Sequence, residues 1–163
     1  MIGFNKLASP GELGNQMFKY AALKGISSNR NLEYCIPPSL NYYIDFLDLS
    51  KLYKFKIIKK FFSNHFLFNC FEMNSLNKKN IKFLESDKII YEKDFNFDKN
   101  LFDNCEDNIN INGFFQTEKY FKTIRPELMK DFTFKNKYRK KSMDIYNNLD
   151  SPISIHIRRT DYL

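Results

Sequence analysis

The chain has 163 residues, of which 43% are hydrophobic and 28% charged, a balance typical of a folded globular protein and not of a disordered one. Its formal net charge of +7 favours anionic partners, such as nucleotides, phosphorylated lipids or nucleic acid, without choosing among them. No apolar run approaches the roughly 20 residues that span a bilayer, so we expect no transmembrane helix.

The N-terminal segment predicts the opening of an α/β unit. A short strand from Ile2 to Leu7 is followed by a loop, Ala8 to Gly14, in which glycine and proline are frequent. Asn15 is a suitable cap for a helix that runs to about Ser27. Phe18, Ala21, Ala22 and Gly25 lie on one face of this helix. The small side chains of Ala21, Ala22 and Gly25 would let a neighbouring element approach closely.

Short strands are predicted along the middle of the chain. Tyr53, Phe55 and Ile57 alternate with lysines, which indicates a half-buried strand. The apolar stretch Ile89 to Tyr91 indicates a further short strand. Ile109 and Ile111 predict a strand that ends at Gly113, after which residues 114–121 turn into a helix.

The C-terminal segment predicts a helix and then a strand. The helix runs from about Asn136 to Leu149 and ends before Pro152. Isoleucines then alternate with polar residues from Ile153 to Arg158, which is typical of a strand. In open α/β sheets, ligands bind at the carboxyl ends of the strands.

A charged cluster stands at the end of this last strand: His156, Arg158, Arg159 and Asp161. Two guanidiniums suit a diphosphate, because arginine offers a planar, permanently charged and bidentate fork. A preorganised arginine stabilises the charge that builds on a nucleoside diphosphate as it leaves a sugar. On the residues alone, a solvated charge pair is an equally good interpretation.

Two other segments contain candidate binding residues. Gly11, Gly14, Asn15 and Gln16 suit a ligand, since glycines allow close backbone approach and a helix N-terminus attracts anions. Phe115, Gln116 and Glu118 combine aromatic and polar side chains, which suits a sugar. A plain capped helix and ordinary core packing, respectively, are the alternatives, and the residues alone favour them.

Other side chains indicate no metal or disulfide site. Cys35, Cys70 and Cys105 are odd in number and form no C-x-x-C pair, which favours a reducing cytoplasm. His65 is isolated among aromatic residues, and no cluster of metal ligands is visible. The basic residues between Lys135 and Lys141 suit a solvated helix face or an anionic membrane surface.

Three segments, taken in order, resemble the α-1,2-fucosyltransferase family, glycosyltransferase family 11. Gly11 to Ala21 reads GELGNQMFKYA, Gly113 to Phe121 reads GFFQTEKYF, and Ser154 to Tyr162 reads SIHIRRTDY. Each is similar to a family segment, and the three follow in the family's order over nearly all of the chain.

The resemblance implies a GT-B architecture of two Rossmann-like domains with the active site between them. Residues 1–150 would form the N-terminal, acceptor-side domain, and residues 151–163 would begin the GDP-fucose-binding domain. The resemblance implies metal-independent, inverting transfer of L-fucose from GDP-fucose to the 2-hydroxyl of a terminal galactoside, without a cofactor. Arg158 would contact the diphosphate and act in catalysis, and His156, Arg159 and Asp161 would support the donor site.

The implied acceptor is a galactose-terminated glycan or a lipid-linked oligosaccharide, and the implied location is the cytoplasm, with peripheral contact at the inner face of the membrane. The family continues with a Ser- and Trp-rich segment, so we expect the 163 residues to be a fragment that is inactive by itself. The alternatives are a non-catalytic truncated remnant and a basic nucleic-acid-binding protein, for which no binding motif is visible.

Overall fold

The computed structural model describes residues 1–9, 11–38 and 66–155. The chain divides into two compact units, Met1–Thr133 and Phe134–Leu163. The domain boundary that we expect at residue 150 stays a prediction.

The first unit is built on a parallel sheet, which confirms the α/β class. Its four strands stand in the order β2-β1-β4-β3, and every neighbouring pair is parallel. The strands are β1 (Ile2–Gly3), β2 (Tyr34–Cys35), β3 (Ile89–Tyr91) and β4 (Ile109–Asn112). Ile2 is paired with Tyr34 on one side and Ile109 on the other. The strands predicted near Ile89 and Ile109 are therefore confirmed, whereas the one predicted at Tyr53 to Ile57 lies outside the described residues.

Strand β1 is shorter than the predicted Ile2 to Leu7. The backbone N–H of Phe4 still donates to the Cys35 carbonyl, but that of Leu7 donates to the Phe4 carbonyl at 2.9 Å. The chain therefore turns directly after Phe4. Ile2, Phe4 and Leu7 are nevertheless all fully buried, so the apolar pattern marked core positions on both a strand and a turn.

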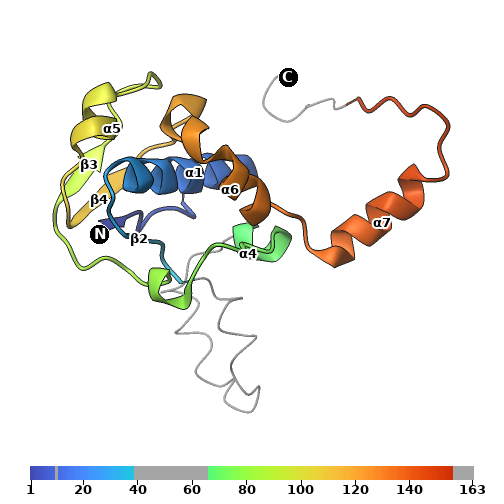
Figure 1. Cartoon of the computed structure of the whole chain (residues 1–163), viewed down its shortest axis with the longest axis horizontal. Helices are drawn as coiled ribbons and strands as arrows, with labels where there is room; N and C mark the ends of the chain where they lie inside the picture. Colours follow the sequence, from blue (N-terminus) through green and yellow to red (C-terminus); the bar gives the residue numbers. More distant parts are fainter. Residues whose placement is uncertain (10, 39–65, 156–163) are drawn as a thin grey trace, which may run out of the picture. The chain divides into compact units, whose positions relative to one another are not determined.

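Helix α1 (Leu13–Asn29) lies at the centre of this unit and contacts α4, α5 and the 3-10 helices η3 and η4 (Figure 1). Glu12, not Asn15, is its N-cap: Glu12 has the extended backbone of a cap, although its side chain makes no capping hydrogen bond. Asn15 lies inside the first turn. The prediction for Gly25 is confirmed, because a Cβ there would stand 1.9 Å from the Tyr120 carbonyl oxygen.

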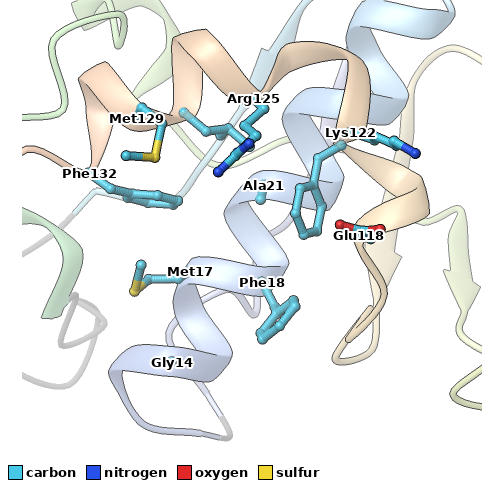
Figure 2. A pocket seen from close by; sticks show the side chains of 11 residues that line it. Gly14, Met17, Phe18, Ala21, Glu118, Lys122, Arg125, Met129 and Phe132 are labelled. Atoms are coloured by element: carbon cyan, nitrogen blue, oxygen red, sulfur yellow. The ribbon is translucent and has the colours of Figure 1, made fainter.

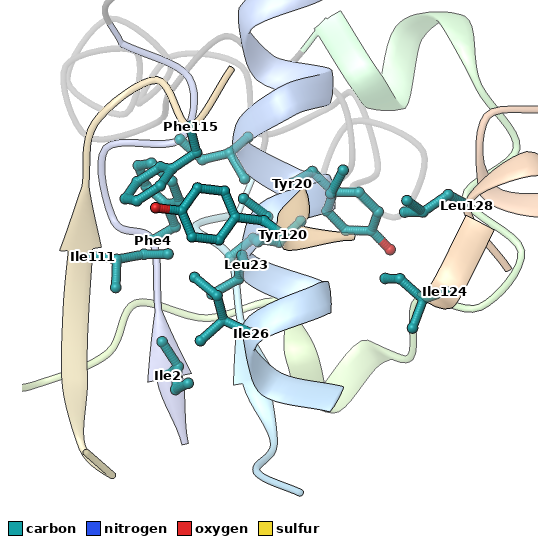
Figure 3. Packing of buried hydrophobic residues seen from close by; sticks show 14 of the residues in the cluster. Ile2, Phe4, Tyr20, Leu23, Ile26, Ile111, Phe115, Tyr120, Ile124 and Leu128 are labelled. Atoms are coloured by element: carbon teal, nitrogen blue, oxygen red, sulfur yellow. The ribbon is translucent and has the colours of Figure 1, made fainter. Parts of the chain in front are cut away.

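The other helices of this unit are short. They are α4 (Phe66–Cys70), η2 (Lys78–Asn80), α5 (Lys99–Asn104), η3 (Glu118–Tyr120), η4 (Lys122–Ile124) and α6 (Arg125–Asp131). Figure 3 shows the core on two sides of α1: Leu23 and Ile26 lie toward the strands, and Tyr20 lies toward Leu128 on α6. The helix expected within residues 114–121 is the single 3-10 turn of η3.

A buried ion pair joins α1 to the end of α6. The Lys24 ammonium lies 2.9 Å from Asp131 Oδ2, with 7% and 0% of the two side chains exposed. Tyr20 and Ser75 also donate to the Asp131 carboxylate, at 2.9 and 2.7 Å. Although burial opposes ionisation, these hydrogen bonds hold the pKa of Asp131 below its usual value. Lys24 has a raised pKa, since its contacts with Asp131 outweigh the opposing effect of burial.

The second unit contains helix α7 (Asn136–Tyr146), close to the predicted Asn136 to Leu149. No residue of α7 is buried, and Tyr138, Ile145 and Leu149 are 41%, 58% and 53% exposed. The predicted strand is wrong for its described part: Ile153 to Ile155 have no strand conformation, and Ile153 is 87% exposed. A β-strand requires a hydrogen-bonded neighbour, and none of the described residues pairs with this exposed segment.

Candidate functional site

The carboxyl edge of the sheet brings two of the three sequence segments together. Parallel strands end at the same edge, and in open α/β sheets ligands bind there. The segment from Gly113 follows β4, and the segment from Gly11 begins between β1 and α1 and continues into α1. Because α1 returns across the sheet, its N-terminus stands at the edge where β1 ends.

A direct hydrogen bond joins the two segments. Gln116 Nε2 donates to Asn15 Oδ1 at 2.7 Å, across 101 residues of sequence. Gln116 is exposed and Asn15 is half-buried. The amide of Gln116 and the first turn of α1 therefore form one polar surface at the carboxyl edge.

The loop before α1 depends on Gly11 and has open space at Gly14. Gly11 has φ of +117°, a conformation that side chains rarely adopt, and a Cβ there would lie 2.6 Å from Asn15 Cβ. A Cβ at Gly14 would meet no atom within 4 Å. Gln16 is fully buried, and its Oε1 accepts from the Phe66 backbone N–H at 2.9 Å. Of these residues, Gly14 and Asn15 are therefore available at the surface, whereas Gln16 holds the loop against α4.

Glu92 fixes the loop that follows β4. Its two carboxylate oxygens accept from the backbone N–H groups of Phe114 and Phe115, at 2.6 and 2.9 Å. A Cβ on Gly113 would lie 2.4 Å from Glu92 Cβ, so Gly113 permits this close approach. Phe115 has φ of +53°, a strained conformation for an aromatic residue. The carboxylate thus stabilises the unusual backbone that precedes Gln116.

The two segments also meet at a pocket of about 320 Å³ beside α1, here called the α1–α6 pocket (Figure 2). Gly14 and Glu118 belong to the two segments, and η3, η4 and α6 supply the opposite wall. Its lining is mostly apolar: Gly14, Met17, Phe18, Ala21, Glu118, Phe121, Lys122, Arg125, Leu128, Met129 and Phe132. This volume is at the small end of ligand pockets, which span about 300–1,000 Å³.

Comparison with known proteins decides the family. The model of glycosyl transferase family 11 matches residues 1–163, the whole chain. The chain belongs to glycosyl transferase family 11. No curated protein and no solved structure matches it.

Membership of family 11 makes this chain part of a glycosyltransferase family, and the carboxyl edge is the corresponding candidate site. The donor-side residues predicted for it lie outside the described residues: His156, Arg158, Arg159 and Asp161. The structure therefore brings together the segments that begin at Gly11 and Gly113. The roles of the donor-side residues stay predictions.

The residues predicted for the acceptor side of this family 11 chain divide into two kinds. Phe115 is fully buried, with its ring against Phe4 and Tyr120 at centroid distances of 5.9 and 5.4 Å. Gln116 and Glu118 are exposed. The structure thus gives Phe115 a packing contact and leaves the two polar side chains at the surface.

Sequence reasoning missed two ionisable groups near this edge of the family 11 chain. Glu92 directly follows the predicted strand Ile89 to Tyr91, which is the signal that would have found it. Lys19 is 1% exposed, and its ammonium lies 5.1 Å from the centre of the Phe114 ring. Burial lowers the pKa of Lys19. No pattern in the sequence distinguishes this lysine from the other lysines of the chain.

Within the described residues of the family 11 chain, no helix is both long and apolar enough to cross a membrane. In the same part of the chain, no group of three or more His, Cys, Asp or Glu side chains is arranged to hold a metal ion. Cys35, Cys70 and Cys105 are free thiols, and burial raises the pKa of Cys105 to about 11.

Proposed function

We propose that this protein serves in the transfer of L-fucose from GDP-fucose to the 2-hydroxyl of a terminal galactoside. The observation that carries the proposal is the hydrogen bond between Asn15 and Gln116, which unites two family 11 segments at the carboxyl edge. Family membership supports sugar transfer in general. The donor, the acceptor and the linkage are the proposed refinement.

In this proposal the sheet unit contributes the acceptor side of a GT-B cleft. Glu92 holds the loop through Phe114 and Phe115, so that Gln116 and Glu118 are positioned for the hydroxyls of galactose. Amides and carboxylates suit this role, because each sugar hydroxyl both donates and accepts hydrogen bonds. Residues from 151 onward begin the donor side.

The transfer step follows from the charges involved. The galactoside 2-oxygen attacks C1 of fucose and loses its proton to a general base, while the bond from C1 to the diphosphate oxygen breaks and GDP leaves with the electron pair. Arg158 neutralises the charge that develops on the diphosphate, with support from His156, Arg159 and Asp161. The guanidiniums of Arg158 and Arg159 supply positive charge without a metal ion, and attack opposite the leaving group inverts the anomeric centre.

The proposed location is the cytoplasm, with peripheral contact at the inner membrane face. Support comes from α7, where Lys137, Arg139, Lys140 and Lys141 are all exposed. A basic residue near an anionic membrane surface contributes about 1 kcal/mol of attraction. Binding to vesicles that contain anionic lipid, but not to neutral ones, supports this location, and equal binding to both contradicts it.

The function is tested with the full-length native protein, labelled GDP-fucose and a β-galactoside. We expect fucose on the 2-hydroxyl, no product from the 2-deoxygalactoside, and unchanged rates in the presence of a chelator. Arg158→Ala should lower kcat by at least about a hundredfold, the scale of losing one preorganised charge-stabilising group, and Arg158→Lys should restore part of it. Transfer from a different nucleotide sugar in preference to GDP-fucose would contradict the proposal.

A further inference from the structure

The walls of the α1–α6 pocket are mostly apolar and favour an apolar ligand or the apolar part of a larger one. Phe18, Phe121 and Phe132 provide aromatic faces, and Met17 and Met129 provide flexible thioether chains. Met129 is 64% exposed and Phe18 is 37% exposed. Methionine adapts its shape to apolar ligands, and burial of such exposed surface is the main gain on binding.

Arg125 places a positive charge over this apolar surface. Figure 2 shows its side chain extending from α6 across the pocket toward Ala21, whereas Lys122 points away. The ion pairs among the described residues do not include Arg125, and the neighbouring acid Glu127 lies 3.2 Å from Lys24. A guanidinium beside apolar walls favours a ligand that joins an anionic group to an apolar chain, and it suits phosphate by its forked geometry.

The position of the pocket relates this ligand to the candidate site. Gly14 and Glu118 both line the pocket and belong to the two segments that Asn15 and Gln116 connect. Met129 and Phe132, from α6 and its C-terminal end, lie away from Gly14 in Figure 2. A ligand that fills the pocket therefore contacts both segments of the carboxyl edge and the apolar side chains of the α6 region.

We propose that the α1–α6 pocket binds the lipid phosphate of the acceptor, with the phosphate at Arg125 and the chain between Met17, Met129 and Phe132. The acceptor is then a lipid-linked oligosaccharide and not a free glycan. The identification of this ligand as an acceptor rests on the proposed fucosyl transfer. The binding of a lipid phosphate does not, because it depends only on the pocket.

The binding experiment uses the full-length native protein and three probes: octyl phosphate, octyl β-galactoside and inorganic phosphate. Calorimetry should rank octyl phosphate first, because only this probe offers both the chain and the charge. Loss of a charged hydrogen bond costs about 1.5–3 kcal/mol, so Arg125→Gln should weaken octyl phosphate about tenfold or more. Lys130→Gln, which removes a positive charge from the same helix outside the pocket lining, should leave the affinity unchanged.

A second variant blocks the pocket by volume. Gly14→Leu adds an apolar side chain where a Cβ meets no atom within 4 Å, so the unit should remain folded while octyl phosphate binding falls. Thermal unfolding of each variant confirms that the fold is retained.

The outcomes separate the pocket from the function. Octyl phosphate that binds no better than inorganic phosphate, or equal losses for Arg125→Gln and Lys130→Gln, would overturn the pocket proposal whatever the transferase assay shows. A dimer that Met129→Glu dissociates would identify a second copy as the occupant and would also overturn it. Octyl phosphate binding without any fucose transfer would support the pocket and reject the proposed function.

Discussion

Helices α1 and α7 show how differently the two units use an apolar sequence pattern. In α1, Tyr20, Ala22, Leu23 and Ile26 are fully buried, and their partners come from β1, β4, η3 and α6. In α7, Met143, Ile145 and Tyr146 are 51–58% exposed. The sequence predicts both helices, but within the part of the chain that the structure describes, α1 packs against elements distant in sequence and α7 buries none of its side chains. Substitutions in the first unit should therefore cost far more stability than those in α7.

The largest effect is expected at Gly25. A Cβ there would lie 1.9 Å from the Tyr120 carbonyl oxygen, and a backbone atom cannot move aside cheaply. Gly25→Ala should therefore lower the free energy of unfolding by about 3 kcal/mol or more, the upper range for overpacking. Denaturant unfolding measures this. Gly14→Ala in the same helix is the matched control, and it should raise stability by about 0.5–1 kcal/mol, since its site is open. Equal effects of the two substitutions would contradict the close packing of α1 on η3.

Asp131→Asn should have the next largest effect. It removes a carboxylate that accepts from Lys24, Tyr20 and Ser75 and is fully buried. Breaking a buried pair by neutralising one partner costs about 3 kcal/mol. Asp144→Asn on the exposed helix α7 is the control, with a change within about 0.5 kcal/mol. A loss at Asp131 as small as that at Asp144 would show that the ion pair does not hold α6 to α1.

The same ion pair predicts how stability depends on pH. The pKa of Asp131 lies below its ordinary value of 3.8, so its contribution is present above about pH 4 and is lost as the pH falls through the lower folded value. The pKa of Lys24 lies above its ordinary value of 10.5, so its contribution is lost only as the pH rises beyond that. The difference in stability between wild type and Asp131→Asn should therefore shrink in acid. A constant difference down to pH 2 would contradict the lowered pKa.

Glu92→Gln should have a smaller effect on stability, about 1.5 kcal/mol, because one of two charged hydrogen bonds to the Phe114 and Phe115 amides is lost. The loop should still form, since the remaining amide oxygen accepts from one of them. If Glu92 positions Gln116 for the acceptor, KM for the galactoside rises while KM for GDP-fucose stays constant. Glu85→Gln, at an exposed position of the same unit, is the control. An unchanged KM for both substrates would restrict Glu92 to a structural role.

Local sequence patterns predicted the helices and strands whose formation depends mainly on residues close together in the chain. A short apolar stretch predicted β3, and alternating isoleucines predicted β4. The Asp-Ser-Pro sequence at 150–152 predicted the end of α7 to within a few residues. The predicted N-cap of α1, Asn15, lies three residues after the observed one, Glu12. The Asn15 side chain does not cap the helix and instead accepts a hydrogen bond from Gln116. That contact depends on the strand order β2-β1-β4-β3, which no local pattern specifies. The clamp at Glu92 and the Lys24–Asp131 pair escaped prediction for the same reason.

The family resemblance predicted the family of the chain but not which residues of the candidate site are exposed. The three family segments predicted the family, and the family match confirmed it. They did not separate surface residues from core residues: Gln16 and Phe115 are fully buried, whereas Gly14, Gln116 and Glu118 are exposed. Side-chain chemistry alone cannot make this distinction, because amides and aromatic rings serve both packing and binding.

The most direct test of the central claim is the transfer of labelled fucose by the full-length native protein from GDP-fucose to a β-galactoside, followed by determination of the linkage. The account predicts fucose on the 2-hydroxyl, and a rise in KM for the galactoside when Gln116 is changed to alanine. A product fucosylated at another hydroxyl, or a Gln116→Ala variant with unchanged kinetics, would contradict the assignment of the carboxyl edge as the acceptor side.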